Sequence, residues 1–349
     1  MKSEIKLSIL DQSIVRQGST PKEAIEETIA TAKLAERLGY HRFWISEHYN
    51  AASIAGSTPE VLMVKLANDT STIRIGSGGI MLPNHSALKV AENFRMLETL
   101  FPGRIDLGMG RAPGTDRITS SVLNPSNDFS EDSYLRQLTH LQHYFHDTAG
   151  TQYGSLLAVP QSETVPMQWI LSSSGGSSRI AAKFGAGLAI ARFINGYADR
   201  AIVDDYRRNF RPSAELASPQ ELLAISVLCA DTEEKALRMR KLMDYRLLQF
   251  EKGNFDKPGS YESIRDYQFT PEELQRIRYN GGRVVSGTPE QVKEQLTLLA
   301  DELDVQEVMA ATMTDNVADR LRSFELLAEV FEINKNNVVP EAAVGSRQM

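Results

Sequence analysis

The stretch Phe43-Trp44-Ile45-Ser46-Glu47-His48-Tyr49 decides the fold class of this chain of 349 residues. Its first three residues form a short apolar run that predicts a buried strand. In parallel α/β proteins, ligands and chemistry lie just beyond the carboxyl ends of the strands. Glu47 and His48 are therefore candidate catalytic residues, His48 as a proton carrier and Glu47 as its orienting neighbour. From this segment alone, a purely structural histidine is an equally good interpretation.

Apolar runs of strand length alternate with amphipathic helical stretches along the rest of the chain. The predicted strands are 5–10, 42–45, 73–76, 104–108, 167–171, 187–191, 222–229 and 305–310. Helices begin at signals such as Thr20-Pro21-Lys22-Glu23, in which Thr caps the helix and Pro takes its first position. Such alternation predicts an α/β fold, a (β/α)8 TIM barrel with insertions. An open doubly wound sheet is the alternative.

We expect residues 1–333 to form one barrel domain. Within it, 253–283 is predicted to be an irregular insertion rich in Gly and Tyr, and 151–159 a small hairpin or extended excursion. The stretch from 111 to about 130 is polar, and the tail 334–349 is expected to be disordered.

Composition limits the partners. The net charge is −7 and no basic cluster is interleaved with aromatic residues, so we expect no nucleic acid. No apolar run approaches the roughly 20 residues that span a bilayer. The charged N-terminus does not resemble a secretory signal, and the single cysteine, Cys229, lies in an apolar run. We therefore expect a cytoplasmic protein without a membrane partner.

A turn of small residues, Ser172-Ser173-Ser174-Gly175-Gly176-Ser177-Ser178, lies between a predicted strand and a predicted helix. Its backbone can approach a ligand, and free amides before a helix favour an anion. We interpret Ser174, Gly175, Gly176 and Ser177 as a phosphate-binding turn. A flexible Ser/Gly turn is the alternative, and no Gly-Lys pair makes it a Walker loop.

Two more glycine-rich segments end predicted strands. Gly76-Ser77-Gly78-Gly79 suits a close approach to a flat ligand or a strained peptide, although a simple bend is the alternative. Gly108-Met109-Gly110-Arg111 presents an arginine whose planar fork binds two phosphate oxygens, although a surface arginine is the alternative. The strand ends also carry Asp11 and Arg192.

The remaining histidines give no strong site. His140, His143 and His146 share one face of a predicted helix, but no acid or cysteine completes a metal site. We interpret that face as solvated and expect no bound metal. His85, which follows Met81-Leu82-Pro83-Asn84, is interpreted as structural.

Together these segments resemble the bacterial luciferase-like, flavin-dependent monooxygenase family over nearly the whole chain. The motifs that carry the resemblance are Trp44-Ile45-Ser46-Glu47-His48-Tyr49, Gly76-Ser77-Gly78-Gly79-Ile80-Met81-Leu82-Pro83, Gly103-Arg104-Ile105-Asp106-Leu107-Gly108-Met109-Gly110-Arg111 and Gly287-Thr288-Pro289-Glu290-Gln291-Val292. The resemblance implies a TIM barrel that binds reduced FMN at the carboxyl ends of its strands.

The resemblance also implies residue roles. His48 matches the family's catalytic histidine, and Gly78-Gly79 match the place of a non-proline cis peptide beside the isoalloxazine. Arg111 and the turn Ser174 to Ser177 match the phosphate site. The family's reactive cysteine falls at Gly110, so modulation by a thiol is not expected. A mobile loop would lie in 253–283.

The implied activity is oxidation of a small organic substrate by O2 and reduced FMN from a separate reductase. No Gly-x-Gly-x-x-Gly fingerprint follows the first strand, which fits that division. One alternative is a deazaflavin-dependent dehydrogenase, disfavoured because such members tend to carry Asp-His where this chain has Glu47-His48. The other is a non-catalytic flavin-binding protein. A homodimer through helices early in the barrel is expected, and light emission is not implied.

Overall fold

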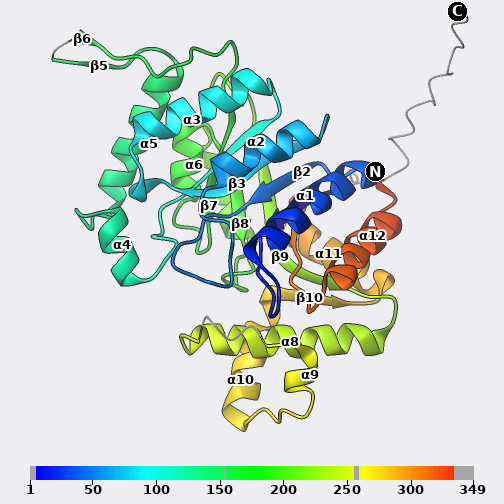
Figure 1. Cartoon of the computed structure of the whole chain (residues 1–349). Coiled ribbons are helices and arrows are strands. Elements are labelled where there is room, and N and C mark those ends of the chain that lie inside the picture. Colours follow the sequence, from blue (N-terminus) through cyan, green and yellow to red (C-terminus); the bar gives the residue numbers. More distant parts are fainter. Residues whose placement is uncertain (1–4, 153, 255–258, 334–349) are drawn as a thin grey trace, which may run out of the picture.

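A closed barrel of parallel strands forms the centre of the computed structural model, which describes residues 5–152, 154–254 and 259–333 (Figure 1). The barrel strands are β1 (Lys6–Asp11), β2 (Arg42–Ile45), β3 (Arg74–Met81), β4 (Ile105–Gly110), β7 (Met167–Ser172), β8 (Gly187–Ala191), β9 (Glu221–Cys229) and β11 (Glu307–Ala311). β11 pairs with both β9 and β1, and β9 also pairs with β8, so the ring is closed. The predicted TIM barrel is confirmed, and the open sheet is wrong.

Helices surround the barrel and connect its strands. They are α1 (Pro21–Leu38), α2 (Pro59–Asp69), η1 (Leu82–Asn84), α3 (Ala87–Leu100), α4 (Arg117–Leu123), α5 (Glu131–Phe145), α6 (Ser178–Phe184), α7 (Arg200–Asn209), α8 (Glu233–Glu251), α11 (Pro289–Leu303) and α12 (Val317–Phe331). The predicted start of α1 is confirmed: Thr20 and Glu23 form a reciprocal capping box. No helix in the described ranges has the length and apolar character needed to cross a membrane.

Several segments differ from the predictions. The polar stretch after Arg111 contains α4, and the insertion 253–283 is not irregular throughout. It holds α9 (Tyr261–Ile264), α10 (Pro271–Asn280) and η2 (Gly281–Arg283). An unpredicted ninth strand of the sheet, β10 (Val284–Gly287), pairs with the carboxyl-terminal part of β9. It has only four residues, too few for a clear apolar pattern.

The predicted hairpin is present as β5 (Gly150–Thr151) and β6 (Gly154–Ser155). His140 and His143 on α5 and His146, which caps its end, are exposed, in agreement with the predicted solvated face. The tail 334–349 lies outside the described residues.

Two tryptophans fill the middle of the barrel. The rings of Trp44 and Trp169 meet edge to face, with 5.5 Å between their centroids. Glycines on neighbouring strands make room for them. A Cβ atom at Gly76 would lie 2.5 Å from Nε1 of Trp44, and one at Gly187 would lie 2.4 Å from Cε3 of Trp169. The large and small residues therefore fit one another, as close packing requires.

A buried ion cluster closes the amino-terminal end of the barrel. Arg42 Nη1 lies 2.7 Å from Asp106 Oδ2, and Arg42 Nε lies 2.6 Å from Glu307 Oε1. Burial raises the pKa of Asp106, but the charges of Arg42 and Arg74 outweigh it and leave this pKa lowered. The residues predicted for the ligand site lie at the opposite, carboxyl-terminal end of the barrel.

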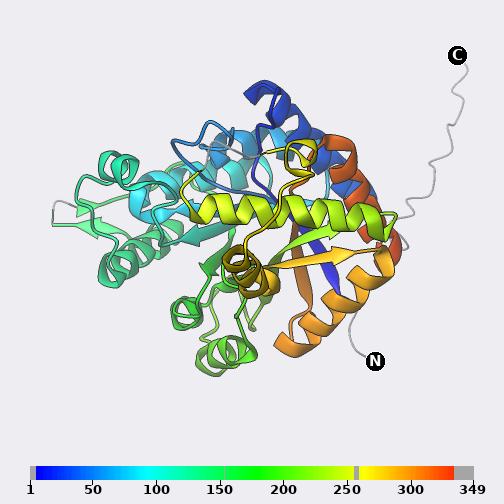
Figure 2. The ribbon, with the colours of Figure 1, turned by 90° about the horizontal axis from the view of Figure 1, so that it is seen from below.

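That opposite end is covered in part by α8. In Figure 1, α8 lies below the strands, with α9 and α10 beneath it; Figure 2, seen from below, shows α8 passing across the barrel. Arg240 on α8 donates to the carbonyl oxygen of Val284 in β10, and Arg246 donates to that of Thr314, just beyond β11. The helix is thus attached to the start of β10 and to the segment that follows β11.

Candidate functional site

The residues predicted for the site occupy one sector of the carboxyl-terminal rim. Glu47-His48 follow β2, Gly78-Gly79 lie in β3, Gly110-Arg111 lie at the end of β4, and Ser174 to Ser177 follow β7. These strands are consecutive neighbours in the sheet, in the order β2-β3-β4-β7. Segments far apart in sequence therefore meet along one side of the barrel mouth.

Glycine is required at the end of β3. The peptide bond between Gly78 and Gly79 is cis, as the resemblance implied, and the pairing with β4 shifts register between Gly78 and Ile80. A Cβ atom at Gly79 would lie 2.5 Å from the carbonyl oxygen of Gly108. Backbone rather than side chain therefore forms this part of the rim.

The hydrogen bonds of Glu47 differ from the prediction. Its carboxylate, in a residue only 1% exposed, accepts from the Met81 amide at 2.7 Å and from the Tyr49 hydroxyl. Its Oε1 atom also lies 2.7 Å from His85 Nε2. The expectation that Glu47 orients His48 is wrong, because adjacent residues of an extended chain point to opposite sides.

His48 has a different neighbour. Its Nδ1 atom lies 3.1 Å from Oγ of Ser46, two residues earlier and on the same side of the extended chain. Among the described residues, none forms a hydrogen bond with His48 Nε2, so this atom is available to a ligand.

The pKa values of the two histidines at this rim, His48 and His85, are shifted in opposite directions. Burial lowers the pKa of His48 and favours its neutral form. Burial also opposes charge on His85, but the hydrogen bond and charge of Glu47 outweigh burial and raise its pKa. His48 is therefore suited to accept a proton, while His85 is suited to carry one. Sequence reasoning missed the partner of Glu47 because His85 is 38 residues away and reaches it through the turn η1.

The turn after β7 has the features expected of an anion site. Gly175 has a φ of +82°, and its amide donates to Ser172 Oγ at 3.1 Å. No described residue accepts a hydrogen bond from the amides of Gly176 and Ser177. Ser174 and Gly176 are exposed, so an anion can reach these donors.

Arg111, the predicted phosphate ligand, is paired with an acid. Its Nη1 atom lies 3.0 Å from Glu131 Oε2 at the start of α5, and the two side chains are 39% and 57% exposed. An exposed pair of this kind is weak, so a phosphate can compete with Glu131 for the guanidinium.

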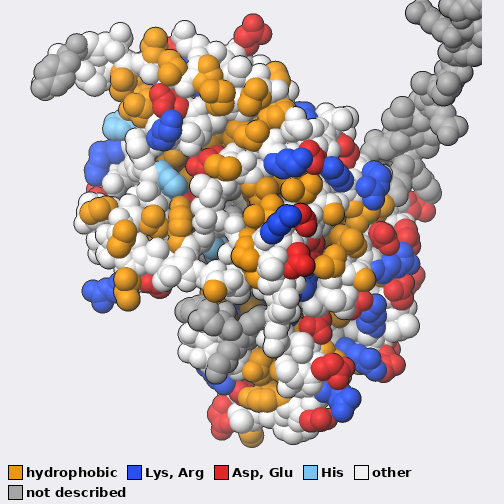
Figure 3. Space-filling view, in the orientation of Figure 1, with side chains coloured by type: hydrophobic (Ala, Val, Ile, Leu, Met, Phe, Trp, Pro, Cys, Tyr) orange, Lys and Arg blue, Asp and Glu red, His pale blue; other side chains and the backbone are white. Residues whose placement is uncertain are grey.

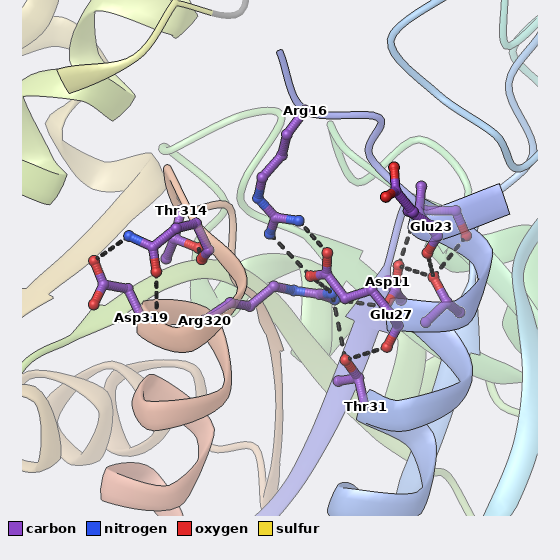
Figure 4. Close-up of polar contacts among 12 residues, drawn as sticks. Asp11, Arg16, Glu23, Glu27, Thr31, Thr314, Asp319 and Arg320 are labelled. Atoms are coloured by element: carbon purple, nitrogen blue, oxygen red, sulfur yellow. Dashed lines mark hydrogen bonds and ion pairs between the residues drawn. The ribbon is translucent and has the colours of Figure 1, made fainter. Parts of the chain in front are cut away.

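Asp11 and Arg192, at the ends of β1 and β8, hold neighbouring segments of the rim together. Figure 4 shows Glu27 beside both Arg16 and Arg320, and Asp11 beside Arg320. Arg320 on α12 donates to Asp11 Oδ2 at 2.5 Å and to Glu27 Oε1 at 2.8 Å, and Arg16 also binds Glu27. This network ties α1 and α12 to the end of β1.

Arg192 connects two loops. It donates to the carbonyl oxygens of Ala198 and Gly282, and so holds the loop after β8 against η2.

Comparison with known sequences decides the family. Residues 5–305 match the family described as luciferase-like monooxygenase. The chain belongs to this family. It is 47% identical over 330 residues to the uncharacterized protein YwcH of Bacillus subtilis (strain 168), which covers 94% of this chain and 99% of YwcH.

Named enzymes are also among the relatives of this luciferase-like monooxygenase. The N-acetyl-S-alkylcysteine monooxygenase of Bacillus subtilis (strain 168) is 36% identical, with 93% of this chain and 98% of the relative covered. The luciferase-like monooxygenase of Escherichia coli (strain K12) is 34% identical, with 94% and 97% covered. The chain is therefore an enzyme of the monooxygenase class.

Solved structures agree with the assignment. Apo-MsnO8 superimposes with a TM-score of 0.88 at 35% identity, covering 94% of this chain and 99% of MsnO8. The oxygenating constituent of a 3,6-diketocamphane monooxygenase, solved with FMN, shares the fold at a TM-score of 0.68 and 16% identity, with 94% and 98% covered.

Replacing Arg320 tests the buried network at the end of β1. Arg320→Gln should lower the free energy of unfolding by about 3–5 kcal/mol, because Asp11 is left buried without its cation. The matched control is Arg322→Gln on the same helix, whose ion pairs are exposed and should contribute under about 1 kcal/mol. Urea unfolding of both variants measures the difference; equal losses would contradict the assignment.

Proposed function

We propose that this protein is an FMN-dependent monooxygenase that takes reduced FMN from a separate reductase and uses O2 to oxidise a small organic substrate. The observation that carries the proposal is the arrangement on neighbouring strands of His48, the glycines of β3 and the open turn after β7. We also expect the enzyme to act in the cytoplasm.

The residues at the rim fit FMN in two respects. The exposed turn Ser174 to Ser177 offers backbone amides to a phosphate, and Arg111 adds a cation that Glu131 must release. We expect the backbone at Gly78-Gly79 and Gly110 to lie against the flat ring, because glycine places no side chain between the backbone and a ligand. These residues would hold the cofactor.

Reduced FMN, when bound, supplies the electrons that activate O2. The protein contributes a base and a covered site. Neutral His48 would accept a proton at Nε2 and return it to the substrate oxygen or the leaving group. The helix α8 lies across the mouth and would limit the entry of water.

A reconstituted assay tests this function. Purified protein is mixed with FMN, NADH and a flavin reductase, and O2 uptake and oxygenated product are measured. The probe substrate is N-acetyl-S-methylcysteine, chosen because a relative is named N-acetyl-S-alkylcysteine monooxygenase. We expect FMN-dependent product formation. His48→Gln should lower kcat about 100-fold with an FMN Kd within about twofold of the native value. Preferential binding of deazaflavin, or no binding of either flavin, would contradict the proposal.

Arg111 should bind the phosphate and not the ring. Arg111→Met is expected to weaken FMN about 10- to 100-fold, because a charge-assisted hydrogen bond to an anion is lost, and to leave riboflavin affinity unchanged. Flavin fluorescence titration measures both ligands. Arg136→Met, an exposed arginine on α5, is the control and should change neither affinity. Equal weakening of FMN and riboflavin binding would show that Arg111 does not bind the phosphate.

We also propose a homodimer that forms through α2 and α3. Large apolar side chains of these helices are exposed, namely Val61, Val64, Met96 and Leu100. Figure 3 shows hydrophobic side chains gathered over this part of the molecule. Exposed apolar patches of this kind are typical of protein interfaces.

Charges placed on that surface should separate the subunits. We expect light scattering to give a dimer for the native chain and a monomer for the double variant Val61→Asp, Met96→Asp, because two unpaired carboxylates would be buried. Ile118→Asp, an exposed residue of α4, is the control and should remain a dimer. A native monomer would overturn the dimer.

A further inference from the structure

The Glu47 carboxylate connects two segments of the rim. It accepts a hydrogen bond from the Met81 amide at the end of β3, and it binds His85 beyond the turn η1. Tyr49 donates to the same carboxylate. Because Glu47 is almost fully buried, its charge requires these partners.

Met81 and η1 in turn support the loop after β4. A Cβ atom at Gly110 would lie 2.8 Å from Met81 Cε, and one at Gly114 would lie 2.7 Å from Met81 Cγ. Asn84 Nδ2 also donates to the carbonyl oxygen of Pro113 at 2.9 Å. The position of Met81 therefore affects both Gly78-Gly79, which precede it, and the backbone around Gly110.

The groups that face His85 favour its protonated form. Glu47 binds it directly, and Glu60 of α2 adds a second negative charge that raises the pKa of His85. Oε2 of Glu60 is buried and has no hydrogen-bond partner among the described residues. From α5, the neutral Gln137 donates to the carbonyl oxygens of Leu82 and His85. The hydroxyl oxygen of Tyr49 lies 3.3 Å from His85 Nε2.

We propose that the pair of Glu47 and His85 is a positioning element, which holds the end of β3 and the loop after β4 in the shape that binds the flavin. The proposal rests on the flavin function proposed above. His85 acts through Glu47 and the backbone, so it is a positioning residue, whereas His48 remains the group available for proton transfer.

This role gives flavin binding a pH dependence of defined sign. The pKa of His85 is raised in the folded protein, so the stabilisation by its charge is present at low pH and is lost as the pH rises through that pKa. Affinity for FMN should therefore fall as the pH rises through the raised pKa of His85. The shift of His48 has the opposite direction, so its protonation does not produce this loss.

The experiment measures the Kd of FMN from pH 6.5 to pH 9 by flavin fluorescence, together with the titration of the His85 imidazole by NMR. We expect the native affinity to fall about 3- to 10-fold, in step with the His85 resonance. His85→Gln keeps a neutral donor at this position. Once the contribution from the titration of FMN itself, which all variants share, is subtracted, the Kd of this variant should not change with pH. His85→Ala leaves Glu47 without this donor and should bind FMN at least about 10-fold more weakly at pH 6.5.

His140→Gln is the matched control, since it removes an exposed histidine of α5 and should keep the native profile. A His85 resonance that titrates at or below the ordinary histidine value, or native and His85→Gln profiles that coincide, would overturn the positioning role alone. No binding of FMN at any pH would overturn the flavin function and this role together.

Discussion

The filling of the barrel interior is the constraint on which the rest of the structure depends. A closed ring of parallel strands directs every second side chain inward, where volume is fixed. Here Trp44 and Trp169 occupy the middle, and they fit only because Gly76 and Gly187 carry no side chain. Charged groups then occur at the two ends, the Arg42 cluster at one and the ligand rim at the other.

Glycine in β3 meets two separate demands. At Gly76 it accommodates a tryptophan ring, and at Gly79 it allows the strand to approach the carbonyl oxygen of Gly108. The same strand thus makes room for a large side chain in the middle of the barrel and packs closely against the backbone of β4 near the rim.

The sequence predicts the barrel well because its signals are local. Apolar runs mark strands such as Arg42 to Ile45, and the Thr20 capping box marks a helix start. It predicts the site less well, because hydrogen bonds depend on side-chain direction and on distant turns. Glu47 and His48 are adjacent in sequence yet point apart, while His85 reaches Glu47 only through η1. The short strand β10 gave no periodic signal at all.

The strands of the barrel differ in length, so the rim at their carboxyl ends is uneven. β8 ends opposite Ala224, whereas β9 continues for five residues to Cys229 and is lined there by β10. At about 3.3 Å per residue, this extension measures roughly 16 Å along β9. The rim therefore extends further at β9 than at the neighbouring β8. The side chains of this extension are buried: Leu228 of β9 and Val284 of β10 pack against Met239 and Met243 of α8. The extra length of β9 therefore supplies the apolar surface on which the covering helix rests.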